Sequence, residues 1–86
     1  MNGGPPAWLP LVGDVEVVVR QAAPVSIHGD AYVDLLAGPD EESPTGLRVP
    51  AHHFPTLPAT GDRLRLHLLM RQVDRVDILE KRGEEA

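Results

Sequence analysis

Four histidines are the residues of this chain best suited to bind a metal ion or to transfer a proton. His52 and His53 are adjacent, whereas His28 and His67 are distant in sequence. Neighbouring side chains on a helical turn point about 100° apart, and histidines that share one ion on a helix are usually four residues apart. No Asp or Glu lies beside the pair to complete a site. We therefore expect one of the two to pack against the domain, the other to be solvated, and no metal to be bound.

Other catalytic arrangements have little support in the sequence. The chain has no cysteine, which excludes disulfides, zinc–thiolate sites and thiol nucleophiles. It also has no notable Ser/His/Asp spacing, no glycine-rich phosphate loop and no pair of carboxylates that we expect to be buried. A chain of 86 residues has little room for a concave pocket. We expect a protein that is not an enzyme and uses no cofactor.

Three basic residues at alternate positions could bind phosphate. Arg63, Arg65 and His67 would share one face of a strand, because successive side chains on a strand point to opposite sides. A row of cations can contact the phosphates of a nucleic acid. The same row can instead form ion pairs with acids on neighbouring strands. The order of the strands decides between the two.

The composition limits the kind of protein that can hold these residues. Eight glycines and nine prolines favour short elements joined by turns over long helices. Thirteen acids against eight bases give a net charge of −5, which disfavours nucleic acid as a partner. No apolar run has the length of a membrane span, and the N-terminus lacks the basic and apolar regions of a secretory signal. We expect one small domain in the cytoplasm, without membrane contact.

Five segments carry the pattern of short strands: 14–20, 31–37, 47–49, 63–68 and 73–79. The fourth alternates strictly between basic and apolar residues, which is the strongest strand pattern in the chain. The pattern therefore predicts an all-β protein.

Interruptions of these patterns predict turns and irregularities. The segment 22–24 ends in a proline, which cannot donate to a strand ladder, so a break or bulge is expected in the first strand. A helical turn is expected over 50–54, between the third and fourth strands, because Pro50 suits a first helical position and Pro55 stops the turn. The apolar run 68–70 predicts a bulge or the end of the fourth strand.

Twelve apolar side chains point inward by this alternation. They are Val15, Val17, Val19, Val33, Leu35, Leu47, Val49, Leu64, Leu66, Leu68, Val76 and Ile78. An open sheet would leave so thin a core uncovered and its edges free. Curling the sheet into a small barrel would bury these residues against one another, so we expect a five-stranded barrel.

The order of the elements resembles the oligonucleotide/oligosaccharide-binding (OB) fold. The resemblance rests on Leu47-Arg48-Val49-Pro50 leading into 51–54, and then on Gly61-Asp62 leading into the strand 63–68. It covers residues 13–80, preceded by an irregular segment over 1–12 and followed by a charged tail over 81–86. An SH3-like barrel is the nearest structural alternative.

This resemblance implies single-stranded nucleic acid as an alternative ligand, with Tyr32, Arg48, Arg63 and Arg65 as its contact residues. Single-strand binders combine a basic groove with aromatic side chains on which bases stack, and the second and third strands here offer one aromatic residue and one cation. An OB-like order also places the fourth strand between the first and the fifth, where Glu16 and Asp77 come within reach of the basic row. For Arg63, Arg65 and His67 we therefore favour ion pairs over phosphate binding.

Apolar residues outside the expected core favour a protein partner. Val18, Leu36 and Leu79 face outward by the alternation, while Trp8, Leu9 and Leu11 precede the first strand. Together with Leu69 and Met70, they would exceed the apolar patch usual for a small monomer. The alternative is that the N-terminal segment folds back and covers them. We expect a non-catalytic binding or adaptor module that contacts a protein partner or a second copy through Trp8, Leu9, Leu11, Tyr32 and Leu36.

Overall fold

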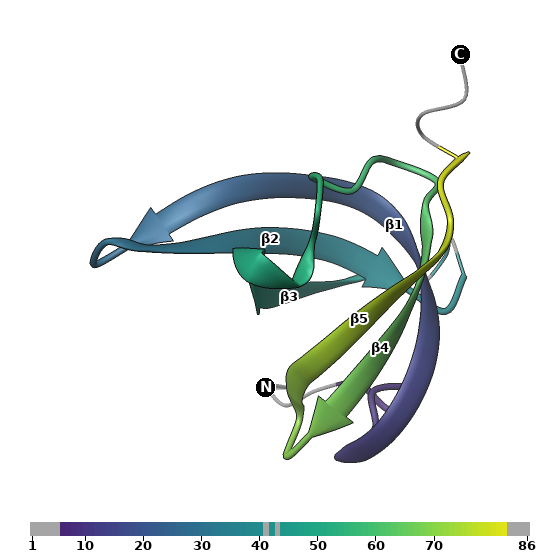
Figure 1. Ribbon diagram of the computed structural model, residues 1–86. Coiled ribbons are helices and arrows are strands. Elements are labelled where there is room, and N and C mark those ends of the chain that lie inside the picture. The colour runs from purple at the N-terminus through teal and green to yellow at the C-terminus, as the bar shows by residue number, and fades with distance from the viewer. Residues whose placement is uncertain (1–5, 41, 43, 83–86) are drawn as a thin grey trace.

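The computed structural model describes residues 6–40, 42 and 44–82. The elements in this part of the chain are β1 (Val12–Ile27), β2 (Asp30–Gly38), β3 (Thr45–Pro50), the 3-10 helix η1 (Ala51–His53), β4 (Arg63–Leu69) and β5 (Gln72–Glu80) (Figure 1). The all-β prediction and the helical turn between the third and fourth strands are confirmed. Residues 1–5, which belong to the expected irregular segment, and 83–86 of the expected charged tail lie outside the described residues.

The strands form one antiparallel sheet in the order β3-β2-β1-β4-β5. β4 therefore lies between β1 and β5, as expected. β3 and β5 are the outer strands, and no strand pairing joins them among the described residues. The sheet bends strongly (Figure 1) but is not closed, so the expected barrel closure is not found. β3 has only six residues, which limits the edge that it can offer to β5.

β1 is a single strand of 16 residues that runs through Pro24, so the expected break at 22–24 is not found. Its first half pairs with β4 as far as Val18, whereas Pro24 belongs to the second half, which pairs with β2 alone. A proline is tolerated where one edge of a strand is free, because no ladder donor is needed on that side. The irregularity lies earlier, as a register shift between Val19 and Gln21.

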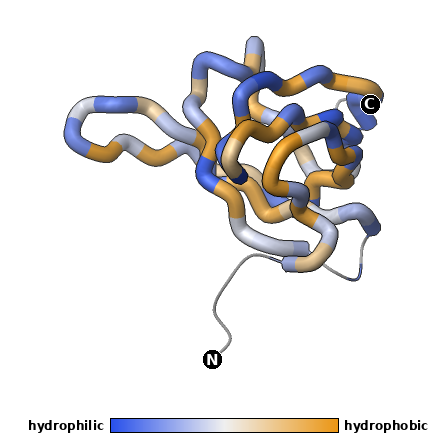
Figure 2. Tube along the Cα trace, turned by 90° about the horizontal axis from the view of Figure 1, so that it is seen from below, coloured by the Kyte–Doolittle hydropathy of each residue, from blue (hydrophilic) through white to orange (hydrophobic). Residues whose placement is uncertain are grey.

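Two tight turns shape the hairpins. His28 and Gly29 connect β1 to β2 with φ values of 53° and 87°, and this hairpin projects from the rest of the molecule (Figure 2). Met70 and Arg71 connect β4 to β5 with φ values of 56° and 66°. The apolar run 68–70 therefore coincides with the end of β4, as predicted, and a register shift follows His67 in the pairing with β5.

The core contains all twelve predicted inward side chains. Eight are buried, and the other four, Val15, Leu47, Val76 and Ile78, are partly buried against them. Leu9, Ala37 and Phe54 complete the buried set. Hydrophobic and hydrophilic residues alternate along much of the chain (Figure 2), as a sheet with one covered face requires.

A polar corner fastens the start of β4 to the middle of β1. The Val19 N–H donates to the Asp62 carbonyl at 2.8 Å, and the Gly61 N–H donates to the Val19 carbonyl at 2.8 Å. The Asp62 side chain is fully buried and accepts a hydrogen bond from the Ala59 N–H at 3.0 Å. The Gly61-Asp62 pair that precedes the fourth strand in the sequence is thus the point where the connection from η1 meets the register shift in β1.

Candidate binding surfaces

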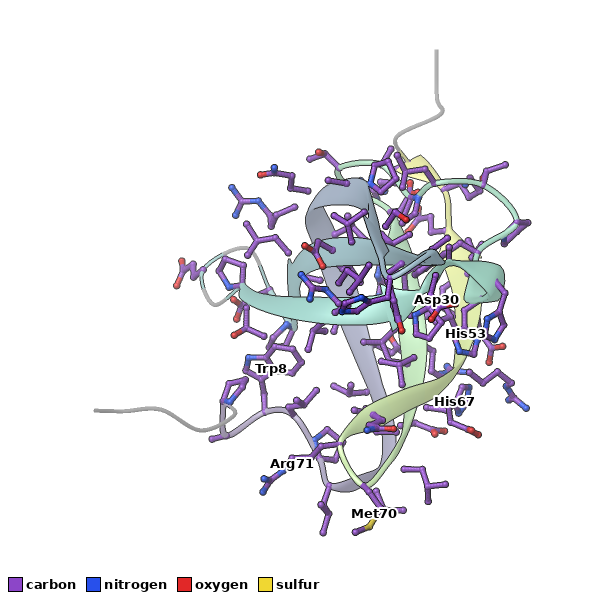
Figure 3. All side chains as sticks on the ribbon, turned by 90° about the vertical axis from the view of Figure 1, so that its left-hand side faces the viewer. Trp8, Asp30, His53, His67, Met70 and Arg71 are labelled. Atoms are coloured by element: carbon purple, nitrogen blue, oxygen red, sulfur yellow. The ribbon has the colours of Figure 1, made fainter. Side chains whose placement is uncertain are left out.

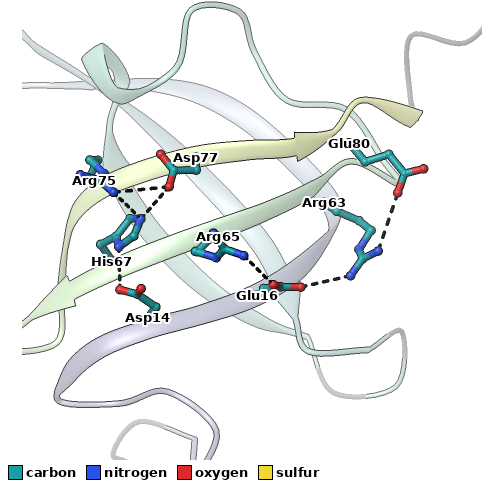
Figure 4. Close-up of polar contacts among 8 residues, drawn as sticks. All are labelled: Asp14, Glu16, Arg63, Arg65, His67, Arg75, Asp77 and Glu80. Carbon is teal, nitrogen blue, oxygen red and sulfur yellow. Dashed lines mark hydrogen bonds and ion pairs between the residues drawn. The ribbon is translucent and has the colours of Figure 1, made fainter.

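The outward faces of β1, β4 and β5 carry a ladder of opposite charges, which we call the charge ladder (Figure 4). Its members are Asp14 and Glu16 of β1, Arg63, Arg65 and His67 of β4, and Arg75, Asp77 and Glu80 of β5. The register explains the pairing, because each base of β4 has an acid directly opposite or two residues along on each neighbouring strand. Arg63 reaches Glu16, and His67 reaches Asp77, across such diagonals. Opposite charges at such positions stabilise a sheet.

Glu16 holds both arginines of the predicted basic stripe. Its carboxylate oxygens lie 3.2 Å from Arg63 Nη2 and 3.0 Å from Arg65 Nη2. Arg63 also approaches Glu80 of β5 at 3.8 Å. The hydrogen bond from Arg65 to Glu16 raises the pKa of Arg65 above its already high ordinary value, so this guanidinium stays charged. The predicted ion pairs are confirmed, and the two cations are neutralised on the surface where phosphate would have to bind.

His67 lies between two carboxylates. Its Nδ1 is 2.6 Å from Asp14 Oδ1 and its Nε2 is 2.8 Å from Asp77 Oδ2, while only 18% of its side chain is exposed. The hydrogen bond with Asp77, and then that with Asp14, raises the pKa of His67, although burial and, more weakly, the charge of Arg75 oppose the shift. The same contact lowers the pKa of Asp77. A protonated imidazole can donate to both acids at once, so the protonated form of His67 can bridge β1, β4 and β5.

The outward face of β2 and β3 is much poorer in charge. Asp34 and Arg48 stand opposite each other and form a two-point ion pair, with Nε–Oδ1 at 2.8 Å and Nη2–Oδ2 at 3.0 Å. The hydrogen bond from Arg48 lowers the pKa of Asp34. Leu36, which is 37% exposed, lies beside this pair in a hollow of about 550 Å³ that Gln21 and Gly46 also line. Tyr32 is partly buried further along β2. Arg48 is thus neutralised as well.

Four large apolar side chains are exposed at one end of the sheet, and we call them the end patch. They are Leu11, Val12, Leu69 and Met70, between 50% and 66% exposed. Val12 pairs with Leu69 across β1 and β4, and the Arg71 N–H donates to the Leu11 carbonyl at 2.8 Å, which holds the four together. Val12 was missing from the predicted contact set. It lies two residues before the expected strand 14–20, inside the segment expected to be irregular.

The N-terminal segment folds back onto the sheet over part of its length. Leu9 is only 9% exposed and belongs to the core, and its N–H donates to the Pro6 carbonyl at 3.1 Å. Leu9, a predicted contact residue, therefore packs mainly into the core of its own chain, and its contact with a partner stays a prediction. Trp8 is partly buried against the same core. Leu11, by contrast, is 50% exposed, so Leu9 and Leu11 do not present one common surface.

His52 and His53 lie side by side on η1. The His52 and His53 rings lie 4.2 Å apart. Burial, and then the neighbouring His52, lowers the pKa of His53. His53 is partly buried and His52 exposed, as expected of one packed and one solvated histidine. In the part of the chain that the structure describes, no three His, Asp or Glu side chains are arranged to hold a metal ion.

Comparison with protein-family models found no match, and comparisons with curated proteins and with solved structures found none either. The described residues include no helix with the length and apolar character that crossing a membrane requires.

Proposed function

We propose that this protein is a non-catalytic protein-interaction module that contacts its partner, or a second copy, through the end patch. The observation that carries the proposal is the clustering of Leu11, Val12, Leu69 and Met70 on the surface. Exposed apolar side chains gathered in one place mark interaction sites more often than scattered ones do. The charges of the neighbouring charge ladder are paired within the chain, whereas the apolar side chains of the end patch are exposed to water.

We also propose that the sheet is an OB-like barrel that stays open. Support comes from the strand order, with β4 between β1 and β5, and from the position of η1 between β3 and β4. OB folds bind ligands on the face of the second and third strands and on the adjoining loops. This resemblance alone does not name a ligand, because one fold serves many functions.

The alternative ligand, single-stranded nucleic acid, has weaker support. Arg48, Arg63 and Arg65 of its predicted site all hold carboxylates, and Tyr32 is the site's one aromatic residue. Fluorescence anisotropy with labelled single-stranded DNA and RNA at low and moderate salt tests it. Binding that weakens steeply with salt would favour nucleic acid, and no binding at low salt would remove it.

The end patch is tested by comparing the wild type with the variant Leu69→Ser/Met70→Ser. Sedimentation measures self-association, and co-purification from native cells followed by mass spectrometry measures partners. The matched control is Leu57→Ser, because Leu57 is a similarly exposed apolar residue on the connection from η1 to β4. We expect a dimer or a co-purified protein with the wild type and the control but not with the double variant. Identical behaviour of all three proteins would contradict the proposal.

A further inference from the structure

The gap between the two outer strands contains a hollow of about 450 Å³. Tyr32, Gly46 and Arg48 line it from β2 and β3, while Arg71 and Gln72 line it from the β4–β5 turn and the start of β5. Because β3 and β5 end the sheet on opposite sides, a hollow lined by both spans its open seam. It also adjoins the end patch, since Arg71 follows Met70 and is bonded through its N–H to Leu11.

β3 presents a free strand edge beside this hollow. It pairs with β2 on one side, and no pairing of its other side is found among the described residues. A free edge is a template on which another extended chain can add a strand, with main-chain hydrogen bonds supplying the affinity. The face of the sheet over Gly46 is also open, because no atom outside Gly46 and its two chain neighbours lies within 4 Å of the position that a Cβ would take there. An extended peptide could therefore lie along this edge.

Arg71 supplies the charge that selects such a peptide. Within the described residues, Arg48, Arg63, Arg65, Arg75 and Arg82 all hold carboxylates, and Arg20 has an interaction of its own. For the Arg71 side chain the described residues provide no hydrogen bond or ion pair. An arginine can bind a carboxylate through two parallel hydrogen bonds, so the ligand that complements this site carries an acidic side chain.

The turn that presents Arg71 is built from unfavourable residues. Met70 and Arg71 both have left-handed backbone angles, a conformation that tight hairpin turns normally assign to Asn and Gly. For other L-residues it is strained, and strain of this kind gathers at functional positions. The two side chains point away from the body of the molecule (Figure 3). The choice of Met and Arg is therefore explained better by what the side chains contact than by the stability of the turn.

From these four features we propose that the open seam binds an extended acidic peptide. The peptide adds a strand to the free edge of β3, places a carboxylate on Arg71, and extends apolar side chains onto the end patch. This inference rests on the proposed protein-interaction function and names its partner class. Nucleic acid fits this seam less well for two reasons. Its affinity depends on several phosphate contacts at once, whereas Arg71 is the one cation that lines the seam without a partner among the described residues. Nucleic acid also cannot add a strand to the free edge of β3.

Selection of short linear peptides from a random phage-displayed library on the immobilised full chain tests the proposal. Enriched peptides are synthesised with a fluorescent label, and their binding is measured by anisotropy. We expect Asp or Glu in each, and an affinity loss of about tenfold or more with Arg71→Gln, as for removal of one partner of a charged pair. Arg82→Gln is the matched control, because Arg82 is also exposed but pairs with Glu80.

The variant Met70→Asn/Arg71→Gly separates binding from folding. It installs the favoured turn residues, so its melting temperature should rise while peptide binding is lost. Amide exchange measured by NMR should also slow along Thr45–Pro50 when a selected peptide is added to the wild type.

Several results would overturn the inference: no enriched peptide, enriched peptides without an acid, equal binding by Arg71→Gln, or unprotected β3 amides. Oligonucleotide binding that depends on Arg71 would replace the peptide with nucleic acid, and an Arg71-dependent dimer would replace it with a second copy. A different result would contradict the proposed function itself: self-association and co-purified partners that are unchanged in Leu69→Ser/Met70→Ser.

Discussion

The two outward faces of the sheet share strand β1 but differ in how they use charge. The first half of β1, with β4 and β5, carries the charge ladder, in which acids and bases pair across three strands. The second half, with β2 and β3, carries the single Asp34–Arg48 pair and a hollow beside it. The face richest in basic residues is thus already saturated by its own acids. A count of cations along one strand is a poor guide to binding unless the neighbouring strands are known.

The largest expected effect on stability distinguishes the core side of β2 from its outward side. Leu35 and Leu36 are adjacent on β2, but the first is 1% exposed and the second 37%. Leu35→Ala should lower the free energy of unfolding by about 2–5 kcal/mol because it leaves a cavity in the core. Leu36→Ala should cost no more than about 1 kcal/mol. Urea unfolding of both variants gives the comparison, and equal losses would contradict this assignment of the two sides of β2.

The next effect lies at the junction of the two faces, where β1 changes partners. Asp62→Ala removes the acceptor for the Ala59 N–H and should cost about 1–3 kcal/mol, because a partly buried donor is left unsatisfied. Asp62→Asn keeps an acceptor oxygen at this position and is the matched control. Thermal unfolding should place Asn between the wild type and Ala. A fully stable Ala variant would show that this corner does not fasten the two halves of the sheet.

A smaller effect, confined to the charge ladder, depends on pH. The pKa of His67 is raised in the folded protein, so its contribution to stability is present below its ordinary value of 6.5 and is lost as the pH rises through the folded-state pKa. The wild type should therefore lose stability relative to His67→Gln as the pH rises above about 6.5. Asp77, with its lowered pKa, acts in the opposite direction, and its contribution is lost as the pH falls through acidic values.

Denaturant unfolding of both proteins across this range measures the difference directly. His53 is present in both and its lowered pKa opposes that of His67, so only the difference between the two profiles reports on the ladder. Parallel profiles would mean that His67 is not held by Asp14 and Asp77 in solution.

The smallest effect is a change in polyanion binding by the charge ladder. Glu16→Gln releases Arg63 and Arg65 from their shared carboxylate, which should create a weak, salt-sensitive affinity for polyanions. Glu42→Gln is the matched control, because it changes the net charge equally and Glu42 has no ion pair with a described residue. Retention on a phosphocellulose column at low salt should increase for Glu16→Gln alone. Equal retention of both variants would show that net charge, and not the local pairing, keeps phosphate away.

Much of the fold could be predicted because strands leave a local signature. Alternation located all five strands and the twelve inward side chains, and Pro50 and Pro55 located the helical turn. The course of β1 through Pro24 could not be predicted, since it depends on whether a second strand lies beside that residue. The same reason applies to Leu9, whose burial depends on a segment folding back over a core formed by distant strands.

Less of the candidate site could be predicted. Leu11 and the apolar run at 69–70 were visible in the sequence, and Glu16 and Asp77 were expected partners of the basic row. Val12 and Arg71 were missed as contact residues. The sequence does not show which arginines form ion pairs, so an unpaired arginine cannot be recognised until the partners of the others are known.

The sequence by itself determined which side chains share a face, because the two-residue period of a strand is a property of the local backbone. It also determined that acids and bases alternate with apolar residues on the same strands. Only the tertiary structure decided which charges meet, that Leu9 is covered, and that β3 and β5 remain apart with Arg71 beside the gap. Those outcomes depend on register and on contacts between residues far apart in the chain, which no local pattern encodes.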